Sequence, residues 1–188
     1  MKFNSKFASL IVFFLLTGFV SAQQTDRDRG IDLYRVGDFT GAMTLLENAV
    51  TTDASDRAAW IFLGGVYVHT GEESKAVQAF AKMNVRPTNP QPTYDRSVKV
   101  TYKPHAPYTE EARKNLSSGK VRIAVEFRAD GTIGFIFPLP TTIDPSLVEQ
   151  SVNAAKSMKF EPAAKDGKPV TAINLVEYGF SVGRRPVI

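Results

Sequence analysis

The stretch that decides the fold of the first half of the chain reads Trp60-Ile61-Phe62-Leu63-Gly64-Gly65-Val66-Tyr67. Its large apolar side chains recur at helical spacing, and the glycines among them allow a second helix to approach closely. The arrangement recurs about 34 residues earlier, because Gly64 then falls on Gly30 and Phe80 falls on Leu46. Three further positions agree at this step: Gly71 with Gly37, Ala76 with Ala42, and Tyr67 with Leu33. We therefore expect two consecutive copies of one helical hairpin.

This pattern resembles the tetratricopeptide repeat, whose unit opens with Trp, two residues, Leu-Gly, two residues and Tyr. The resemblance implies two turns, at Gly37-Asp38 and Gly71-Glu72, and four helices, near residues 25–36, 39–52, 56–69 and 73–84. About three such repeats are usual for independent stability. We therefore expect the two repeats to pack against the second half of the chain or against a second copy.

In the repeat family, the first helix of each hairpin lines a concave binding face. By that resemblance the groove consists of seven residues: Arg27, Ile31, Tyr34, Arg35, Ile61, Val68 and His69. An arginine pair beside a tyrosine can clamp a peptide carboxylate, because a guanidinium group donates two parallel hydrogen bonds. The alternative is that these side chains only solvate a short helical face.

The N-terminus has the three parts of an export signal, and the predicted signal peptide covers residues 1–22. Lys2 and Lys6 form a basic head, an apolar run follows over residues 7–16, and small residues precede the expected cleavage point after Ala22. The apolar run is shorter than the roughly 20 residues that a membrane-spanning helix needs. This pattern favours cleavage and a periplasmic product. The alternative is an uncleaved N-terminus that anchors the chain in the inner membrane.

The composition excludes several classes of site. The chain has no cysteine, which removes disulfides, thiol nucleophiles and cysteine-based metal sites. The net charge of +4 comes with no cluster of five or more Lys or Arg, so we expect a solvated basic surface and no nucleic-acid partner. The two histidines, His69 and His105, fall in different predicted domains, and no catalytic or metal-binding motif is present. We therefore expect no enzyme, no metal and no cofactor.

A proline-rich segment over residues 87–97 divides the chain. Proline ends helices and favours an extended spacer, so this segment predicts a linker. The predicted helical domain then covers residues 23–86, and the second domain covers residues 98–188.

The second domain begins with period-two alternation. Val121, Ile123, Val125 and Phe127 alternate with Arg122, Ala124, Glu126 and Arg128, which predicts a half-buried strand. The pair Asp130-Gly131 then predicts a hairpin turn, with a return strand over residues 132–137. Asp144-Pro145 predicts the start of a helix, because Asp caps free amides and Pro suits the first turn.

A second tight turn, at Asp166-Gly167, precedes a long strand over residues 170–182. The apolar side chains of this strand change phase near Leu175. The change indicates either a β-bulge or a strand with both faces partly covered.

Several short motifs occur here in a fixed order: Pro107-Tyr108-Thr109-Glu110-Glu111-Ala112-Arg113, Gly119-Lys120-Val121, Asp130-Gly131, Lys159-Phe160-Glu161-Pro162-Ala163 and Asp166-Gly167-Lys168-Pro169-Val170. Their order and spacing resemble the TonB C-terminal domain family over about residues 98–183. The resemblance implies an antiparallel three-stranded sheet with two helices, the first at about residues 108–116. The whole chain is then an α+β protein of two domains. Thr109 stands where this family usually has Pro, and Met158 stands where it often has Trp.

TonB domains capture an extended peptide from an outer-membrane transporter by adding it as a strand to a sheet edge. By the resemblance, the edge is the last strand, with seven candidate residues: Ile173, Asn174, Leu175, Glu177, Tyr178, Phe180 and Val182. The alternative is that the repeats or a second copy of the chain cover this edge, which leaves a homodimer open.

TonB energy transducers keep an N-terminal membrane anchor and a long proline-rich stretch, whereas this chain has a signal-like N-terminus and a repeat module. We therefore expect a periplasmic adaptor that binds an extended peptide at the TonB-like edge and a second protein partner at the repeats. The alternative is a TonB-type component that energises an outer-membrane transporter.

Overall fold

The computed structural model describes residues 24–84 and 94–182. The predicted signal peptide and residues 87–93 of the predicted linker lie outside the described residues. Within these two ranges, no helix has the length and apolar character needed to cross a membrane.

The N-terminal module is built from four helices: α1 Asp26–Arg35, α2 Phe39–Thr52, α3 Arg57–His69 and α4 Glu73–Ala81, the last continued by a 3-10 turn, Lys82–Asn84. Asp38 and Asp56 cap α2 and α3 by accepting backbone amides of the first turn. Gly37 and Gly71 take positive φ angles of 86° and 78° between the helices of each pair. The predicted helices and both predicted turns are confirmed.

The two hairpins make the same internal contact. A Cβ atom added at Gly30 would lie 2.8 Å from Leu46 Cγ, and one added at Gly64 would lie 2.6 Å from Phe80 Cε1. Each glycine therefore lets the first helix of its pair touch a large side chain of the second. These are the two contacts that the internal repeat predicts.

Over residues 94–182, the C-terminal domain has seven strands and two helices: β1 Lys99–Tyr102, α5 Glu110–Lys114, β2 Gly119–Phe127, β3 Ile133–Pro138, α6 Pro145–Lys156, β4 Lys159–Glu161, β5 Ala163–Lys165, β6 Lys168–Val170 and β7 Ala172–Phe180. Strands β3, β2 and β7 form an antiparallel sheet in that order, which confirms the predicted α+β fold. Two small antiparallel pairs, β1 with β4 and β5 with β6, were not predicted.

The register of β7 corrects one alternative from the sequence. Strand β7 pairs with β2 without interruption from Gly119↔Phe180 to Phe127↔Ala172, so no bulge occurs at Leu175. The phase change has the other cause, because Ile173 and Leu175 pack against the helical hairpins while Val176, Tyr178 and Phe180 pack on the opposite face. A register shift occurs instead between β2 and β3, beside Val125.

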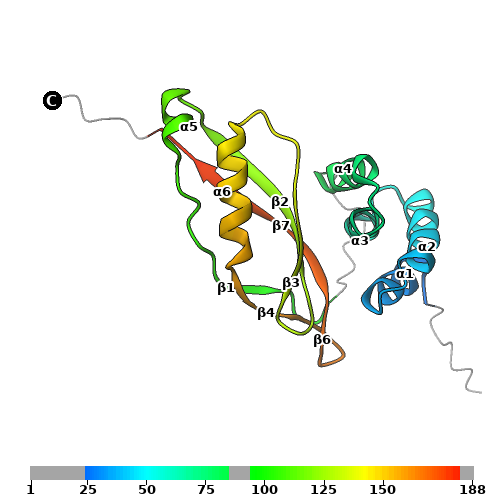
Figure 1. The fold of residues 1–188 in the computed structure, drawn as a ribbon. Helices are drawn as coiled ribbons and strands as arrows, with labels where there is room; N and C mark the ends of the chain where they lie inside the picture. Colours follow the sequence, from blue (N-terminus) through cyan, green and yellow to red (C-terminus); the bar gives the residue numbers. More distant parts are fainter. Residues whose placement is uncertain (1–23, 85–93, 183–188) are drawn as a thin grey trace, which may run out of the picture.

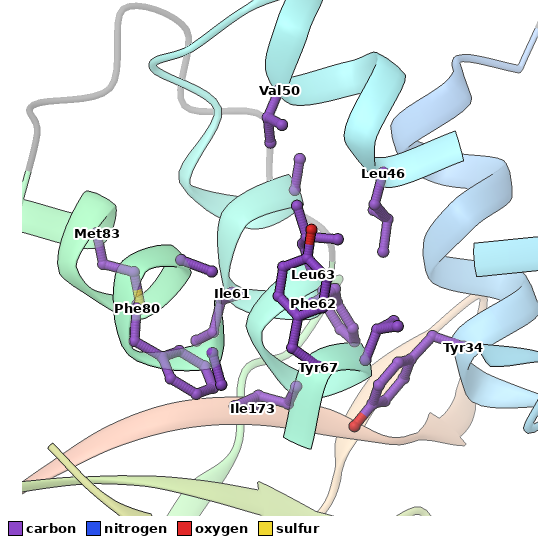
Figure 2. Packing of buried hydrophobic residues seen from close by; sticks show 14 of the residues in the cluster. Tyr34, Leu46, Val50, Ile61, Phe62, Leu63, Tyr67, Phe80, Met83 and Ile173 are labelled. Atoms are coloured by element: carbon purple, nitrogen blue, oxygen red, sulfur yellow. The ribbon is translucent and has the colours of Figure 1, made fainter. Parts of the chain in front are cut away.

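The sheet lies between two hydrophobic cores. One core joins α5 and α6 to one face of the sheet. The other joins the helical hairpins to the opposite face, and Figure 2 shows Ile173 of β7 extending towards the helices. The expected packing of the repeats against the second half is therefore confirmed. The prediction that β2 is half-buried is wrong for its second part, because the hairpins also bury Ala124 and Glu126.

Candidate functional site

Strand β7 is an edge of the main sheet. Among the described strands, its one sheet neighbour is β2. Among the described residues, no backbone group forms a hydrogen bond with the outer side of β7. This outer side is therefore available for pairing with another strand.

A side-chain contact identifies which backbone groups face outward. Lys103 Nζ donates to the carbonyl oxygen of Glu177 at 2.9 Å, so that carbonyl points away from β2. Backbone groups of alternate residues point to the same side of a strand. The amides and carbonyls of Ile173, Leu175 and Gly179 therefore also face outward.

The start of the same edge carries a second cation. The carbonyl of Thr171 faces Arg35 Nε at the long distance of 3.5 Å. Arg35 also pairs with Asp32 at 3.1 Å and lies over the rings of Phe62 and Tyr94. The helical module thus reaches the edge at the point where β7 begins.

The seven predicted edge residues fall into three groups. Ile173 and Leu175 direct their side chains into the core shared with the hairpins, and Tyr178 and Phe180 direct theirs into the opposite core. Glu177 is exposed and pairs with Lys120 at 2.6 Å. Asn174 is half-buried, and Val182 lies exposed beyond the end of the strand. The strand therefore offers backbone groups at its edge, while one face and the first half of the other are used for packing.

A buried carboxylate, Glu126 of β2, lies in the interface between the module and the sheet. Its side chain is 4% exposed. The Tyr34 hydroxyl donates to Glu126 Oε1 at 2.5 Å, and His69 Nε2 lies 3.1 Å from the same oxygen. Arg128 Nε donates to the other oxygen at 3.2 Å. A Cβ at Gly134 would lie 1.6 Å from that oxygen, so only glycine leaves room for the carboxylate.

The hydrogen bonds at this interface determine the ionisation of both partners. Burial alone raises the pKa of Glu126, but the contacts with His69 and Tyr34 outweigh it and hold that pKa below its ordinary value. Burial, together with the Glu126 charge, raises the pKa of Tyr34 far above its ordinary value. Glu126 is therefore ionised and Tyr34 is neutral near pH 7.

Aromatic rings surround this contact. Phe39 stacks on His69 with the ring centroids 4.1 Å apart, and Phe135 of β3 meets the same imidazole edge-on at 5.6 Å. The Tyr34 ring packs at right angles on Phe62. Figure 2 shows the Tyr34 hydroxyl directed towards the sheet. Inside this cluster the Glu126 side chain is only 4% exposed, and a low-polarity environment strengthens its polar contacts.

The structure brings part of the predicted groove together. Tyr34 and His69 converge on Glu126, and Ile31 and Ile61 lie buried in the shared core, with Val68 packed against it. The two arginines are paired elsewhere, Arg35 with Asp32 and Arg27 with Asp28 and Asp56. The carboxylate that this face holds is the chain's own Glu126.

Three residues of the site were missed from the sequence. Glu126 occupies a polar position of an alternating strand, and the small Ala124 beside it was the one sign that this face is covered. Gly65, the second glycine of the pair at residues 64–65, lets α3 approach β7, since a Cβ there would lie 2.4 Å from Ile173 Cδ1. For Lys103 the sequence offers no comparable signal.

Comparison with known families covers the C-terminal half. Residues 104–182 match the family model described as Gram-negative bacterial TonB protein C-terminal. The match spans α5, α6 and the whole main sheet, so the predicted resemblance is confirmed for this part of the chain. The helical hairpins precede the match. No curated protein matches the chain.

Proposed function

We propose that this chain, which carries a TonB C-terminal domain, is a periplasmic adaptor that binds an extended peptide by strand addition along β7. The observation that carries the proposal is the open outer side of β7. One face of that strand is packed along its length and the other is packed at Ile173 and Leu175, whereas its outward amides and carbonyls meet no backbone partner among the described residues. Strand addition uses main-chain hydrogen bonds for affinity and side-chain contacts for specificity.

The proposed partner is the N-terminal segment of an outer-membrane transporter. The support is the family match, because TonB C-terminal domains act on such transporters from the periplasm. Each main-chain hydrogen bond contributes about 1 kcal/mol net. The main chain alone therefore gives weak binding, and the side chains beside the edge decide which segments are held.

In this proposal, the helical module supports the strand that binds the peptide. Its hairpins cover part of one face of the sheet and contact β7 through Ile173 and Leu175. A second partner at the tetratricopeptide-like groove remains part of the proposal, but Tyr34 and His69 are available to it only if the module separates from the sheet. Arg27, which is paired within the module, is the groove residue least dependent on that step.

The alternative function, a TonB-type component that energises a transporter, is also supported by the family match. It requires a membrane anchor at residues 1–22. N-terminal sequencing of the protein purified from cells tests this requirement, because an adaptor is expected to have lost these residues and a transducer to retain them.

The strand-addition proposal is tested at Gly179. Its amide faces outward, and a Cβ added there meets no atom within 4 Å. Gly179→Pro removes this outward amide and leaves the hydrogen bonds to β2 in place, whereas Gly179→Ala keeps the amide and is the matched control. Thermal unfolding shows whether each variant is folded.

A photo-crosslinking residue placed at exposed Glu177 then reports the partner in intact cell envelopes, with the same residue at Glu149 of α6 as the positional control. We expect a crosslinked protein from position 177 and none from position 149. We expect Gly179→Pro to abolish the crosslink and Gly179→Ala to retain it. A crosslink that survives Gly179→Pro in a folded protein contradicts strand addition at β7.

A further inference from the structure

Two lysines contact Glu177, in the second half of β7, and each binds a different group of that residue. Lys120 pairs with the Glu177 carboxylate at 2.6 Å. Lys103 donates to the Glu177 carbonyl at 2.9 Å and lies 4.9 Å from the centre of the Tyr178 ring. Within the described part of the chain, no carboxylate lies within ion-pair distance of Lys103. The ammonium group of Lys103 therefore has a carbonyl and an aromatic face as partners, and no counter-charge.

The position of Lys103 is fixed from both sides. The residue follows β1, which pairs with β4 from Lys99 to Tyr102 with a register shift between Val100 and Tyr102. The chain then continues to Tyr108, whose ring packs against Phe180 and whose hydroxyl donates to the Ser117 carbonyl. The extended segment that carries Lys103 is thus held beside the last residues of β7. The Lys103 ammonium group binds the Glu177 carbonyl, which is one of the outward-facing acceptors of the edge.

Strand addition changes the partners of Lys103. An incoming strand directs one of its own amides at the Glu177 carbonyl and therefore competes with Lys103 Nζ for that acceptor. Lys103 is exposed, so water can hydrate the displaced ammonium group, but a carboxylate on the incoming strand is the stronger acceptor. Glu177 already pairs with Lys120 through Oε1, so its single negative charge would have to serve two lysines.

We infer that Lys103 makes the β7 edge selective for a class of extended segments. These segments carry an Asp or Glu whose side chain lies on the same face of the sheet as Tyr178, close to the Glu177 carbonyl. The inference rests on the proposed strand addition and adds the class of segment that is accepted. In the absence of a partner, the same lysine protects the edge from nonspecific pairing. A cation bound to an edge acceptor opposes the addition of an uncharged strand.

The test uses synthetic peptides of about ten residues, which is the length of one strand on this edge. The peptides alternate Val and Thr, with one Glu scanned through every position, with Gln at the same position as the neutral control and with Lys there as the charge-reversed peptide. The full chain is compared with Lys103→Met and Lys103→Glu. Lys99→Met is the control for net charge, because Lys99 lies on β1 and pairs with Glu161.

We expect one position of the scan at which Glu improves binding over Gln by about fivefold, the effect of one well-placed ion pair. Lys103→Met removes this preference and Lys99→Met keeps it. Lys103→Glu instead prefers a Lys at that position. Peptides that bind with no preference for Glu, or with a preference that survives Lys103→Met, overturn the inference while strand addition stands. Binding of no peptide overturns strand addition and the inference together.

Discussion

The contact between Tyr34 and Glu126 leads to a quantitative prediction. Tyr34→Phe removes one hydroxyl and leaves the ring in place against Phe39 and Phe62. That hydroxyl donates at 2.5 Å to a buried carboxylate. Hydrogen bonds to charged groups contribute about 1.5–3 kcal/mol, so we expect the free energy of unfolding to fall by about 2 kcal/mol.

The second arm of the experiment is Glu126→Gln, alone and with Tyr34→Phe. Glutamine keeps the size of the side chain and one acceptor oxygen but removes the charge. If Tyr34 acts on the Glu126 charge, the double variant loses less stability than the two single variants together. We expect an interaction energy of about 1–2 kcal/mol in this cycle.

The assay is urea unfolding of the full chain near pH 7, followed by circular dichroism and by the fluorescence of Trp60. Trp60 is the single tryptophan and lies in α3, so it reports on the helical module. Because the two modules share one core, we expect both signals to change in a single transition.

Tyr67→Phe is the matched control. Its hydroxyl also donates to a carboxylate, Glu47 at 2.8 Å, but this pair lies within the helical module and Glu47 is exposed. An exposed partner stays hydrated, so we expect a loss below about 1 kcal/mol. If Tyr34→Phe costs no more than Tyr67→Phe, or if the cycle gives no interaction energy, Glu126 does not hold the module on the sheet.

Three further predictions concern the same two cores. The pKa of Glu126 lies below its ordinary value, so the stability that its charge contributes is present at neutral pH and is lost as the pH falls through that lowered pKa. The urea midpoint should therefore fall more for the wild type than for Glu126→Gln between about pH 6 and about pH 3.5, and equal falls would contradict this. Gly65→Val overfills the space next to Ile173 and should cost about 1–3 kcal/mol, part of which Ile173→Ala should restore; a variant as stable as the wild type refutes the close approach. The buried hydroxyl of Tyr178 has no hydrogen-bond partner among the described residues, so Tyr178→Phe should leave stability unchanged or raise it by about 1 kcal/mol, and a clear loss in thermal unfolding would reveal a partner.

The parts of the fold that depend on neighbouring residues could be predicted from the sequence. Helix starts follow from capping by Asp38 and Asp56, and the turn glycines Gly37 and Gly71 mark where each hairpin reverses. The hairpin at Gly131 and the helix that begins after Asp144 also depend on local chemistry. These signals involve a few adjacent residues, which the sequence displays directly.

The features that remained hidden depend on distant parts of the chain. Glu126 follows the rule for a solvent-facing position, and its burial requires helices that lie far earlier in the sequence. The edge strand could be predicted from the resemblance, but the lysine that binds one of its outward carbonyls could not. Lys103 comes from a short extended segment with no periodic pattern, and only the folded chain places it on Glu177.

The position of β7 between two cores has a consequence for the order of folding. Synthesis begins at the N-terminus, so the hairpins exist long before their final apolar contacts, Ile173 and Leu175, have been made. Contacts of such large sequence separation form late and slow the folding of a domain. The unfinished helices therefore expose an apolar surface during this interval, a state that promotes aggregation. Because β7 contributes to both cores, loss of this strand by proteolysis removes the proposed peptide-binding edge and exposes the apolar face of the hairpins at the same time.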